Sequence, residues 1–354
     1  MKALVTDNGL LIRSANLLTK RSMGNGLKEV EVPRPVINKN EILVKVGATA
    51  LNPIDTKFVD VLAPAGNVAG CDFGGTIEEV GEDARGSWNI GDRVAGFVQG
   101  SIDEERGAFA EYVKVERDLV WKLPDEVKDE EGASFGLAVA TAMQALHLHL
   151  DVPWPDESAK SPGSPIFIYA GSSSVGIFAI QLAKKAGCTV VTTASPHSFE
   201  LVKKYGADHV FDYHAPTAAQ DIAKAHPDIT RAVDCFSEGE STEFCAQVMQ
   251  DNGGKVVKLL DSKTRVPGVE TTFIMSFQLL GKAFAWLPPI GPKFPAATRE
   301  RDALVKFYAS LPELAKTLKT PPVRLVEGGF RGIQEGLDMI RAKKVSGAKL
   351  VVKL

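Results

Sequence analysis

A loop rich in glycine and serine is the feature of this sequence with the clearest chemical meaning. It follows the apolar run 165–170 and precedes a helix-like run over 174–187. At such a strand-to-helix turn, backbone N–H groups and the helix dipole can bind a dinucleotide pyrophosphate. The loop consists of Gly171, Ser172, Ser173, Ser174, Val175 and Gly176. Ser173 replaces the middle glycine of the GxGxxG pattern, so an ordinary turn without a ligand is the alternative interpretation.

The next position that could contact a dinucleotide lies roughly 20 residues beyond the loop. An acidic residue there would bind the ribose hydroxyls of NADH, but residues 192–197 contain no carboxylate. Ser195 and His197 can instead donate hydrogen bonds to a ribose phosphate. The sequence therefore predicts NADPH rather than NADH as the cofactor.

The elements that would position these residues alternate in type. Between residues 165 and 260, strand-like runs alternate with helix-like runs, which predicts parallel strands joined by right-handed crossovers. Residues 1–128 contain short β-like runs separated by Pro and Gly turns, which indicates a β-rich unit. A helical run over 300–318 and a last strand over 348–354 follow. We predict an α/β protein with a doubly wound parallel sheet, a split β-rich domain and a cleft between the two.

Composition and charge exclude several classes of function. The 354 residues carry 41 Lys and Arg against 44 Asp and Glu, and a net charge of -3 does not suit a nucleic-acid binder. Four widely spaced cysteines and an N-terminus without signal-peptide character predict a reducing, cytoplasmic location. The longest apolar stretch, 135–150, contains Gln144, His147 and His149 and is shorter than the roughly 20 residues that span a bilayer. We interpret it as a buried core helix and predict no membrane span.

Longer motifs occur along nearly the whole chain. They are NPIDTK at 52–57, AGCDFGGTIEEVG at 69–81, SPHSFELVKKYGADHVFDY at 195–213, RLVEGGF at 324–330 and SGAKLVVKL at 346–354. Together they resemble the medium-chain dehydrogenase/reductase superfamily, and within it the fungal trans-acting enoyl reductases that serve polyketide synthases. The resemblance implies a Rossmann cofactor-binding domain over 141–283 and a GroES-like catalytic domain made of 1–140 and 284–354. It also implies a monomer that acts on an acyl-carrier-bound polyketide intermediate, with a polyketide synthase as partner.

The same resemblance has a consequence for metal chemistry. Zinc-dependent members carry a catalytic Cys in the loop matched here by 52–57, and a His–Glu pair where this chain has Cys71 and Asp72. No group of four cysteines is present to hold a structural zinc. We therefore predict no metal, and a zinc-free reductase that acts on activated carbon–carbon double bonds.

The resemblance also assigns roles to individual residues. Lys57 and Thr141 fall on positions that line the active-site cleft in the family. We expect Lys57 to act as a hydrogen-bond donor or proton source and Thr141 to position the nicotinamide or the substrate; the alternatives are a surface lysine and a threonine bonded to its own helix. Tyr213 is expected against the adenine ribose, and Leu259 and Leu260 against the nicotinamide.

A second group of residues is predicted to surround the substrate. It comprises Asn52, Phe273, Phe277, Phe284 and Trp286. The four aromatic residues supply a wall that can take an acyl chain, although packing between domains is an equally good interpretation. For Asn52, the alternative is a structural role in which its side chain fixes the loop.

These residues define one leading function and two alternatives. The leading function is NADPH-dependent reduction of the α,β-double bond of a carrier-bound polyketide intermediate in secondary metabolite biosynthesis. Such a reaction needs a hydride at the β-carbon, stabilisation of the enolate on the thioester oxygen and a proton at the α-carbon. The alternatives are a stand-alone quinone or small-enone reductase, which would share the fold, and a cofactor-binding protein without turnover.

A basic segment, 282–306, is a candidate docking site for the carrier. Its charged residues are Lys282, Lys293, Arg299, Arg301 and Lys306 against Glu300 and Asp302. Carrier proteins are generally acidic, so we expect this segment to guide association, with a solvated connector as the alternative.

Overall fold

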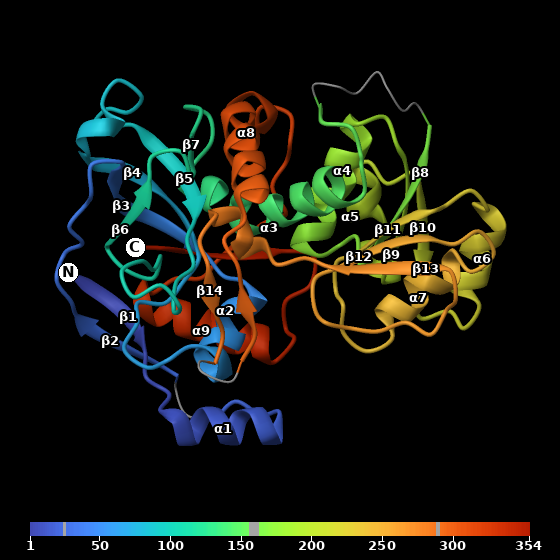
Figure 1. The fold of residues 1–354 in the computed structure, drawn as a ribbon, viewed down its shortest axis with the longest axis horizontal. Coiled ribbons are helices and arrows are strands. Elements are labelled where there is room, and N and C mark those ends of the chain that lie inside the picture. Colours follow the sequence, from blue (N-terminus) through green and yellow to red (C-terminus); the bar gives the residue numbers. More distant parts are fainter. Residues whose placement is uncertain (24–25, 156–162, 288–290) are drawn as a thin grey trace. The chain divides into compact units, whose positions relative to one another are not determined.

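A computed structural model describes residues 1–23, 26–155, 163–287 and 291–354. The chain folds as two compact units (Figure 1). The first unit consists of 1–137 and 277–354, and the second unit of 138–276. The catalytic and cofactor-binding roles of the domains 1–140 with 284–354 and 141–283 stay predictions.

The second unit is built on a six-stranded parallel sheet. In the sheet the strand order is β10-β9-β8-β11-β12-β13, and every neighbouring pair is parallel. The strands are β8 (Pro165–Tyr169), β9 (Thr189–Ala194), β10 (His209–Asp212), β11 (Arg231–Asp234), β12 (Gly254–Lys258) and β13 (Val269–Phe273). The order reverses between β8 and β11, which is where doubly wound sheets bind ligands at the carboxyl ends of their strands. The predicted doubly wound α/β class is confirmed.

Helices connect these strands. They are η3 (Gln144–His149), α4 (Ser174–Lys185), η5 (Pro196–Ser198), α5 (Phe199–Lys204), α6 (Ala218–Ala225) and α7 (Ser241–Val248). Helix α4 follows Ser173 as its N-cap, and two residues beyond its end Gly187 has a φ of 83°, a left-handed conformation that suits glycine. Phe167, Val191 and Val256 from the sheet pack with Ile222 and Cys245 from the helices to form a buried core.

The first unit is rich in β-structure, as predicted. Its main sheet has seven strands in the order β16-β17-β3-β4-β5-β7, with β6 also paired to β3. They are β3 (Glu41–Ala50), β4 (Asp72–Val80), β5 (Arg93–Phe97), β6 (Tyr112–Glu116), β7 (Val120–Lys122), β16 (Val323–Leu325) and β17 (Lys349–Lys353). Two antiparallel strand pairs accompany it: β1 (Lys2–Thr6) with β2 (Leu27–Glu31), and the β14–β15 hairpin, made of β14 (Phe284–Ala285) and β15 (Lys293–Phe294). Because β17 pairs with β3, the end of the chain returns to the sheet that its beginning started.

The first unit also contains helices. They are α1 (Leu10–Thr19), α2 (Pro53–Lys57), η1 (Phe58–Leu62), η2 (Glu82–Ala84), η6 (Ser276–Leu280), α8 (Thr298–Ala315) and α9 (Phe330–Arg341). The sequence pattern predicts α8 but neither α1 nor α9. Helix α9 buries Ile333 and Leu337 against Leu350 and Val352 of β17. A Cβ at Gly336 would collide with the Leu51 side chain, so this glycine lets α9 lie close to the sheet domain.

The apolar stretch 135–150 is buried as predicted, but it is not one regular helix. Helix α3 (Asp129–Met143) is broken at Gly136, where φ is 21° and ψ is -129°, and η3 follows it as a π-helix. The break turns the N–H of Leu137 toward the Asp72 carboxylate, 2.7 Å away. A Cβ at Gly136 would collide with that carboxylate. Within the described ranges no helix is long and apolar enough to cross a membrane.

Candidate functional site

The glycine loop of the second unit joins β8 to α4. The Ser173 hydroxyl accepts the N–H of Gly176 at 3.1 Å, which caps the helix. The N–H of Gly171 donates to the Thr193 carbonyl at 2.9 Å. A Cβ at Gly171 would collide with the Thr192 hydroxyl, and one at Gly176 with the Ala170 carbonyl. Both glycines are therefore required for the loop to lie this tightly at the start of α4, a geometry that suits a bound pyrophosphate.

The residues predicted to select the cofactor lie at the ends of the next two strands. Ser195, just after β9, donates its hydroxyl to the Tyr213 hydroxyl at 3.3 Å. His197 lies in η5 and is exposed, and the rings of Tyr213 and His214 are in contact, tilted by 31° with centroids 4.0 Å apart. The structure thus brings the side chains of Ser195 and Tyr213 together. His197 follows Ser195 by two residues in the chain.

An aromatic residue that the sequence analysis did not single out lies beside this group. Tyr169 ends β8, and its ring is 6.0 Å from Tyr213 and 5.3 Å from Phe244. Burial raises the pKa of the Tyr169 hydroxyl, so this group is neutral at ordinary pH. The available sequence signal was its position, directly before the glycine loop at the carboxyl end of the first strand.

Asp234, also missed, organises the loops next to the predicted nicotinamide position. This buried residue ends β11 and accepts hydrogen bonds from the hydroxyls of Ser241 at 2.8 Å and Thr242 at 2.6 Å, and from the N–H of Ser237 at 2.8 Å. The Ser237 hydroxyl accepts the N–H of Leu259 at 2.8 Å. A chain of bonds therefore runs from Asp234 to Leu259, which with Leu260 follows the end of β12.

Thr141 lies on the part of α3 that belongs to the second unit. It is buried, and its hydroxyl is 2.8 Å from the hydroxyl of Ser276. The contact holds Thr141 by a side chain outside its own helix. Its predicted role toward nicotinamide or substrate stays a prediction.

In the first unit, Lys57 is placed by the short helix α2. The N–H of Asn52 donates to the Asp55 carboxylate at 2.8 Å, and Pro53 starts the helix with a fixed φ. Lys57 is the last residue of α2, is half-buried and lines a pocket of about 330 Å³. Asn52 itself is buried, so its side chain acts inside the unit.

The Asn52 side chain belongs to a buried group that we call the Asp72 network, made of Asn52, Asp72, Lys349 and the N–H of Leu137. The Asp72 carboxylate accepts from Asn52 Nδ2 at 2.8 Å, from Leu137 N–H at 2.7 Å and from Lys349 Nζ at 3.2 Å. Lys349 Nζ also donates to the side-chain amide oxygen of Asn52, Oδ1. Asp72 is fully buried and Lys349 is 3% exposed. The network links the start of α2 to β4 and β17.

Two further titratable groups face this network. Burial and the charge of Asp72 raise the pKa of Asp55 to about 7. Burial and the charge of Asp55 raise the pKa of the Cys71 thiol well above its usual value. Cys71 is therefore a neutral thiol beside two carboxyl groups and the Lys349 ammonium.

This arrangement does not fit a zinc ion. In the described ranges, no three His, Cys, Asp or Glu side chains are grouped so that they could hold a metal. In the region that the resemblance matches to zinc ligands, the Lys349 ammonium contacts both Asn52 and Asp72. A dication beside this ammonium would be repelled. Zinc independence stays a prediction.

The predicted aromatic wall divides between the units. Phe277, Phe284 and Trp286 belong to the first unit, and their rings form one cluster with those of Phe58, Phe97 and Phe294. Phe273 ends β13 in the second unit. The β14–β15 hairpin, through residues 283–285 and 293–295, lines an open groove of about 600 Å³.

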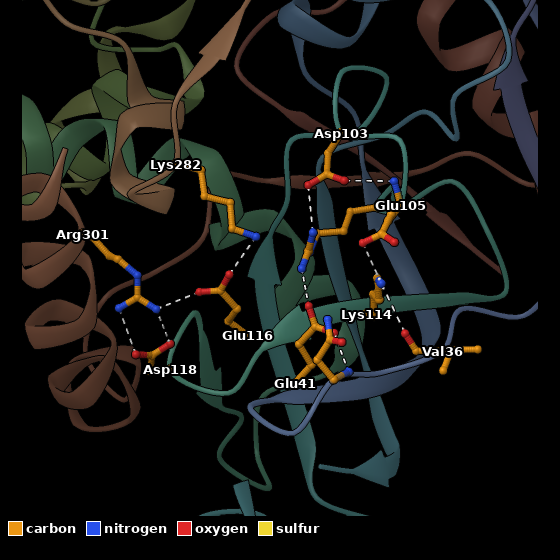
Figure 2. A network of polar contacts seen from close by, with 11 residues as sticks. Val36, Glu41, Asp103, Glu105, Lys114, Glu116, Asp118, Lys282 and Arg301 are labelled. Atoms are coloured by element: carbon orange, nitrogen blue, oxygen red, sulfur yellow. Dashed lines mark hydrogen bonds and ion pairs between the residues drawn. The ribbon is translucent and has the colours of Figure 1, made fainter. Parts of the chain in front are cut away.

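The basic segment 282–306 is partly neutralised within the first unit. Figure 2 shows Lys282 reaching Glu116 at 2.8 Å and Arg301 reaching both Glu116 and Asp118 at 2.8 Å. Lys293 is exposed on β15. Of the five cations counted from the sequence, at least Lys282 and Arg301 are thus already paired with carboxylates.

Two family models match the chain. Residues 38–125 match the alcohol dehydrogenase GroES-like domain, and residues 174–264 match the zinc-binding dehydrogenase family. Together they cover the β-rich part of the first unit and most of the second unit's sheet.

The chain is similar to curated fungal proteins over most of its length. It is 39% identical to the trans-enoyl reductase FSL5 of Gibberella zeae over 91% of this chain and 92% of that protein. It is 33% identical to the trans-enoyl reductase thnE of Trichoderma harzianum over 99% of both chains.

Solved structures share the fold. The quinone oxidoreductase of Coxiella burnetii matches with a TM-score of 0.69 and 24% identity, covering 100% of this chain and 99% of that one. A mycobacterial protein solved in complex with NADPH matches with a TM-score of 0.71 and 22% identity, covering 100% of both chains.

Proposed function

Because the chain belongs to the medium-chain dehydrogenase/reductase superfamily and to its trans-enoyl reductases, we propose that it reduces the α,β-double bond of a carrier-bound polyketide intermediate. The observation that carries the proposal is similarity over more than nine-tenths of the chain to proteins named trans-enoyl reductases. The enzyme would work in trans, as a separate cytoplasmic monomer that meets a polyketide synthase. Its catalytic domain would comprise 1–140 and 284–354, and its cofactor domain 141–283.

The cofactor is NADPH. The tight loop between Gly171 and Gly176 would bind the pyrophosphate at the start of α4, and the exposed His197 and the neighbouring Ser195 would bind the ribose phosphate. Tyr213 would lie along the adenine ribose, and the backbone at Leu259 and Leu260 along the nicotinamide. When bound, NADPH supplies the hydride for the β-carbon.

The chain's own residues supply the remaining chemistry. Lys57, held at the end of α2, would donate from its ammonium to the thioester oxygen as negative charge develops there. The same group would serve as the source of the proton for the α-carbon. Thr141 would position the nicotinamide or substrate through a hydroxyl that Ser276 orients. Asn52 contributes by fixing the start of α2 through the Asp72 network.

The aromatic cluster and the groove at the β14–β15 hairpin would hold the acyl chain. The rings of Phe284 and Phe294 stack at 4.7 Å, and Trp286 lies 5.1 Å from Phe294. Such a surface favours an apolar chain over a small polar enone. This preference separates the proposal from its rival, a quinone or small-enone reductase with the same fold.

One assay tests the proposal: NADPH oxidation measured with an enoyl thioester, with a quinone and without an acceptor. We expect turnover with the thioester that rises with acyl chain length. Faster turnover with the quinone would favour the rival, and no turnover with either would indicate a binding protein. Lys57→Ala should lower kcat more than it raises KM, because its contact strengthens in the transition state.

A further inference from the structure

Helix α1 presents its apolar side to solvent instead of to the protein. Leu10, Leu11, Leu17 and Leu18 are 72%, 87%, 55% and 83% exposed, whereas Asn16 is buried. The helical period places the four leucines on one face and Asn16 on the opposite face. A surface helix normally shows the reverse arrangement, and a contiguous exposed apolar face of this kind marks an interaction site.

Polar bonds hold the other side of α1 on the π-helix η1. Arg13 Nε donates to the Val61 carbonyl and Asn16 Nδ2 to the Asp60 carbonyl, each at 2.9 Å. The Asn16 side-chain oxygen accepts the N–H of Met23 at 2.8 Å, which fixes the segment after the helix. The leucine face therefore points outward because specific bonds orient the helix, and not because the helix lacks contacts.

A pocket of about 330 Å³ adjoins the C-terminal end of α1. Lys20 and Arg21, from the turn after α1, line it together with Lys57 from α2. Asp60 lines it as well, but its carboxylate is paired with Arg341 at 2.7 Å. The pocket thus combines several cations with the residue that we propose for catalysis, and it lies entirely within the first unit.

The charge of this region differs from that of the whole chain. Residues 8–23 contain Arg13, Lys20 and Arg21 and no carboxylate, in a protein whose net charge is -3. A surface with this balance attracts an acidic partner and accelerates their association. An acyl-carrier domain has matching chemistry: an acidic surface, and an arm that joins it to the acyl thioester through a phosphodiester.

We propose that α1 and the adjoining pocket form the docking surface for the acyl-carrier domain. The leucine face packs against the carrier, Lys20 and Arg21 bind the phosphodiester of its arm, and the pocket directs the thioester toward Lys57. This inference rests on the proposed function. It also replaces segment 282–306 as the main docking element, since Lys282 and Arg301 are already paired with carboxylates of their own unit (Figure 2).

The first test reverses the charges. Lys20→Glu/Arg21→Glu is compared with wild type in binding to a fluorescently labelled carrier domain and in turnover of the enoyl chain on that carrier. We expect about tenfold weaker binding and about tenfold lower kcat/KM, with the difference shrinking at high salt. Turnover of the same acyl group on N-acetylcysteamine is the reference, and the carrier-bound substrate should lose at least about fivefold more than it, because N-acetylcysteamine has no phosphodiester for Lys20 and Arg21 to bind. The control variant Lys28→Glu/Lys45→Glu reverses the charge of two exposed lysines of the same unit. It should change neither carrier binding nor turnover of the carrier-bound substrate.

The second test removes the apolar face. Leu11→Asn/Leu18→Asn should weaken carrier binding and carrier-dependent turnover about tenfold, with little dependence on salt, because the lost contact is apolar. The matched control is Val36→Asn/Ile90→Asn, at residues that are 82% and 72% exposed elsewhere in the first unit. All of these side chains face solvent, so the melting temperature should not change.

Three results would overturn the inference. Equal losses on the carrier-bound and small thioesters would show that these residues act on the fold or on Lys57 and not on the carrier, and unchanged carrier binding in both variants would remove α1 from docking. Wild-type self-association, or binding to phosphatidylserine vesicles, that Leu11→Asn/Leu18→Asn abolishes would assign the face to a second copy or to a membrane. An enzyme inactive on both thioesters would reject the proposed function, while the binding arm would still decide whether the carrier docks on α1.

Discussion

Two buried aspartates, one in each unit, anchor loops at strand ends in different ways. Asp72 begins β4 and is held by a full positive charge, the Lys349 ammonium, together with the Asn52 amide and the Leu137 N–H. Its partners come from segments far apart in the sequence: Asp72 and Lys349 are separated by 277 positions. The first unit therefore depends on an ion pair between Asp72 and Lys349, which forms only when strands β4 and β17 come together.

Asp234 ends β11 and is held by neutral donors. Its carboxylate accepts from the hydroxyls of Ser241 and Thr242 and from the N–H groups of Phe236 and Ser237. All four donors follow within eight positions of the aspartate. Among the residues that the structure describes, no lysine or arginine bonds to Asp234.

This difference predicts how the stability of each unit responds to substitution of the residues that bond to its aspartate. Removing the single cation beside Asp72 leaves a buried negative charge without a counter-charge, and such a change is strongly destabilising. Removing one of four neutral donors beside Asp234 leaves three in place. We expect a sharp loss of stability in the first unit and a graded loss in the second.

Lys349→Met gives the largest expected effect. It should reduce the free energy of unfolding by about 3–5 kcal/mol, because Asp72 stays buried without its cation. Urea denaturation followed by fluorescence measures it. Lys349→Met/Asp72→Asn should recover much of the loss, since it removes both charges; a double variant no more stable than Lys349→Met would show that packing, and not charge, dominates.

Asp55→Asn should change the pH dependence of stability. The pKa of Asp55 is raised to about 7 by burial and by Asp72, so its neutral form is favoured in the folded state. The stability that protonated Asp55 contributes to the folded state is fully present below a pH of about 4. It is lost as the pH rises to about 7, which lowers the free energy of unfolding by a few kcal/mol. The variant should gain stability relative to wild type across that range, as followed by denaturation at several pH values. A constant difference from pH 4 to pH 8 would contradict the raised pKa.

Ser195→Ala/His197→Ala should affect the ligand and spare the fold. Each charge-assisted bond is worth about 1.5–3 kcal/mol, so NADPH affinity should fall roughly tenfold or more, with NADH affinity and the melting temperature nearly unchanged. Titration of both cofactors measures the effect. Equal losses for NADPH and NADH would show that these residues support the second unit's structure.

Thr242→Val gives the smallest expected effect. It removes one hydroxyl from Asp234 at similar volume and should cost about 1.5 kcal/mol in the free energy of unfolding, the low end for a bond to a charged group, because three other donors remain. A loss as large as that of Lys349→Met would remove the distinction between the two anchors. Urea denaturation under the same conditions makes the two values comparable.

Local patterns were sufficient to predict the second unit. The alternation of strands and helices over 165–260 and the strand–loop–helix pattern with Gly171 and Gly176 are local signals, and the parallel sheet and α4 confirm the elements they predict. Asp234 was missed because an aspartate at a strand end has no distinctive pattern, although the serines and threonine that follow it are the residues that satisfy it.

The first unit was harder for two physical reasons. The Asp72 network joins residues from opposite ends of the chain, and no local pattern reports that Lys349 meets Asp72. Helix α1 reverses the usual rule, because Arg13 and Asn16 face the protein and the leucines face solvent. The sequence did single out the loop 52–57 and the pair Cys71 and Asp72 as the region that the resemblance matches to zinc ligands, but the contacts of Lys349 with this region were found only in the structure.

The position of β17 has a consequence for biosynthesis. Residues 138–276 are translated as one uninterrupted block, so the second unit can fold while the ribosome is still making the rest of the chain. The sheet of the first unit stays open at β3 until residues 349–353 emerge, and until then Asp72 has no ammonium to pair with. A stalled or shortened nascent chain would therefore expose one edge of a nearly finished sheet, which is the kind of surface that chaperones bind and that aggregates form from.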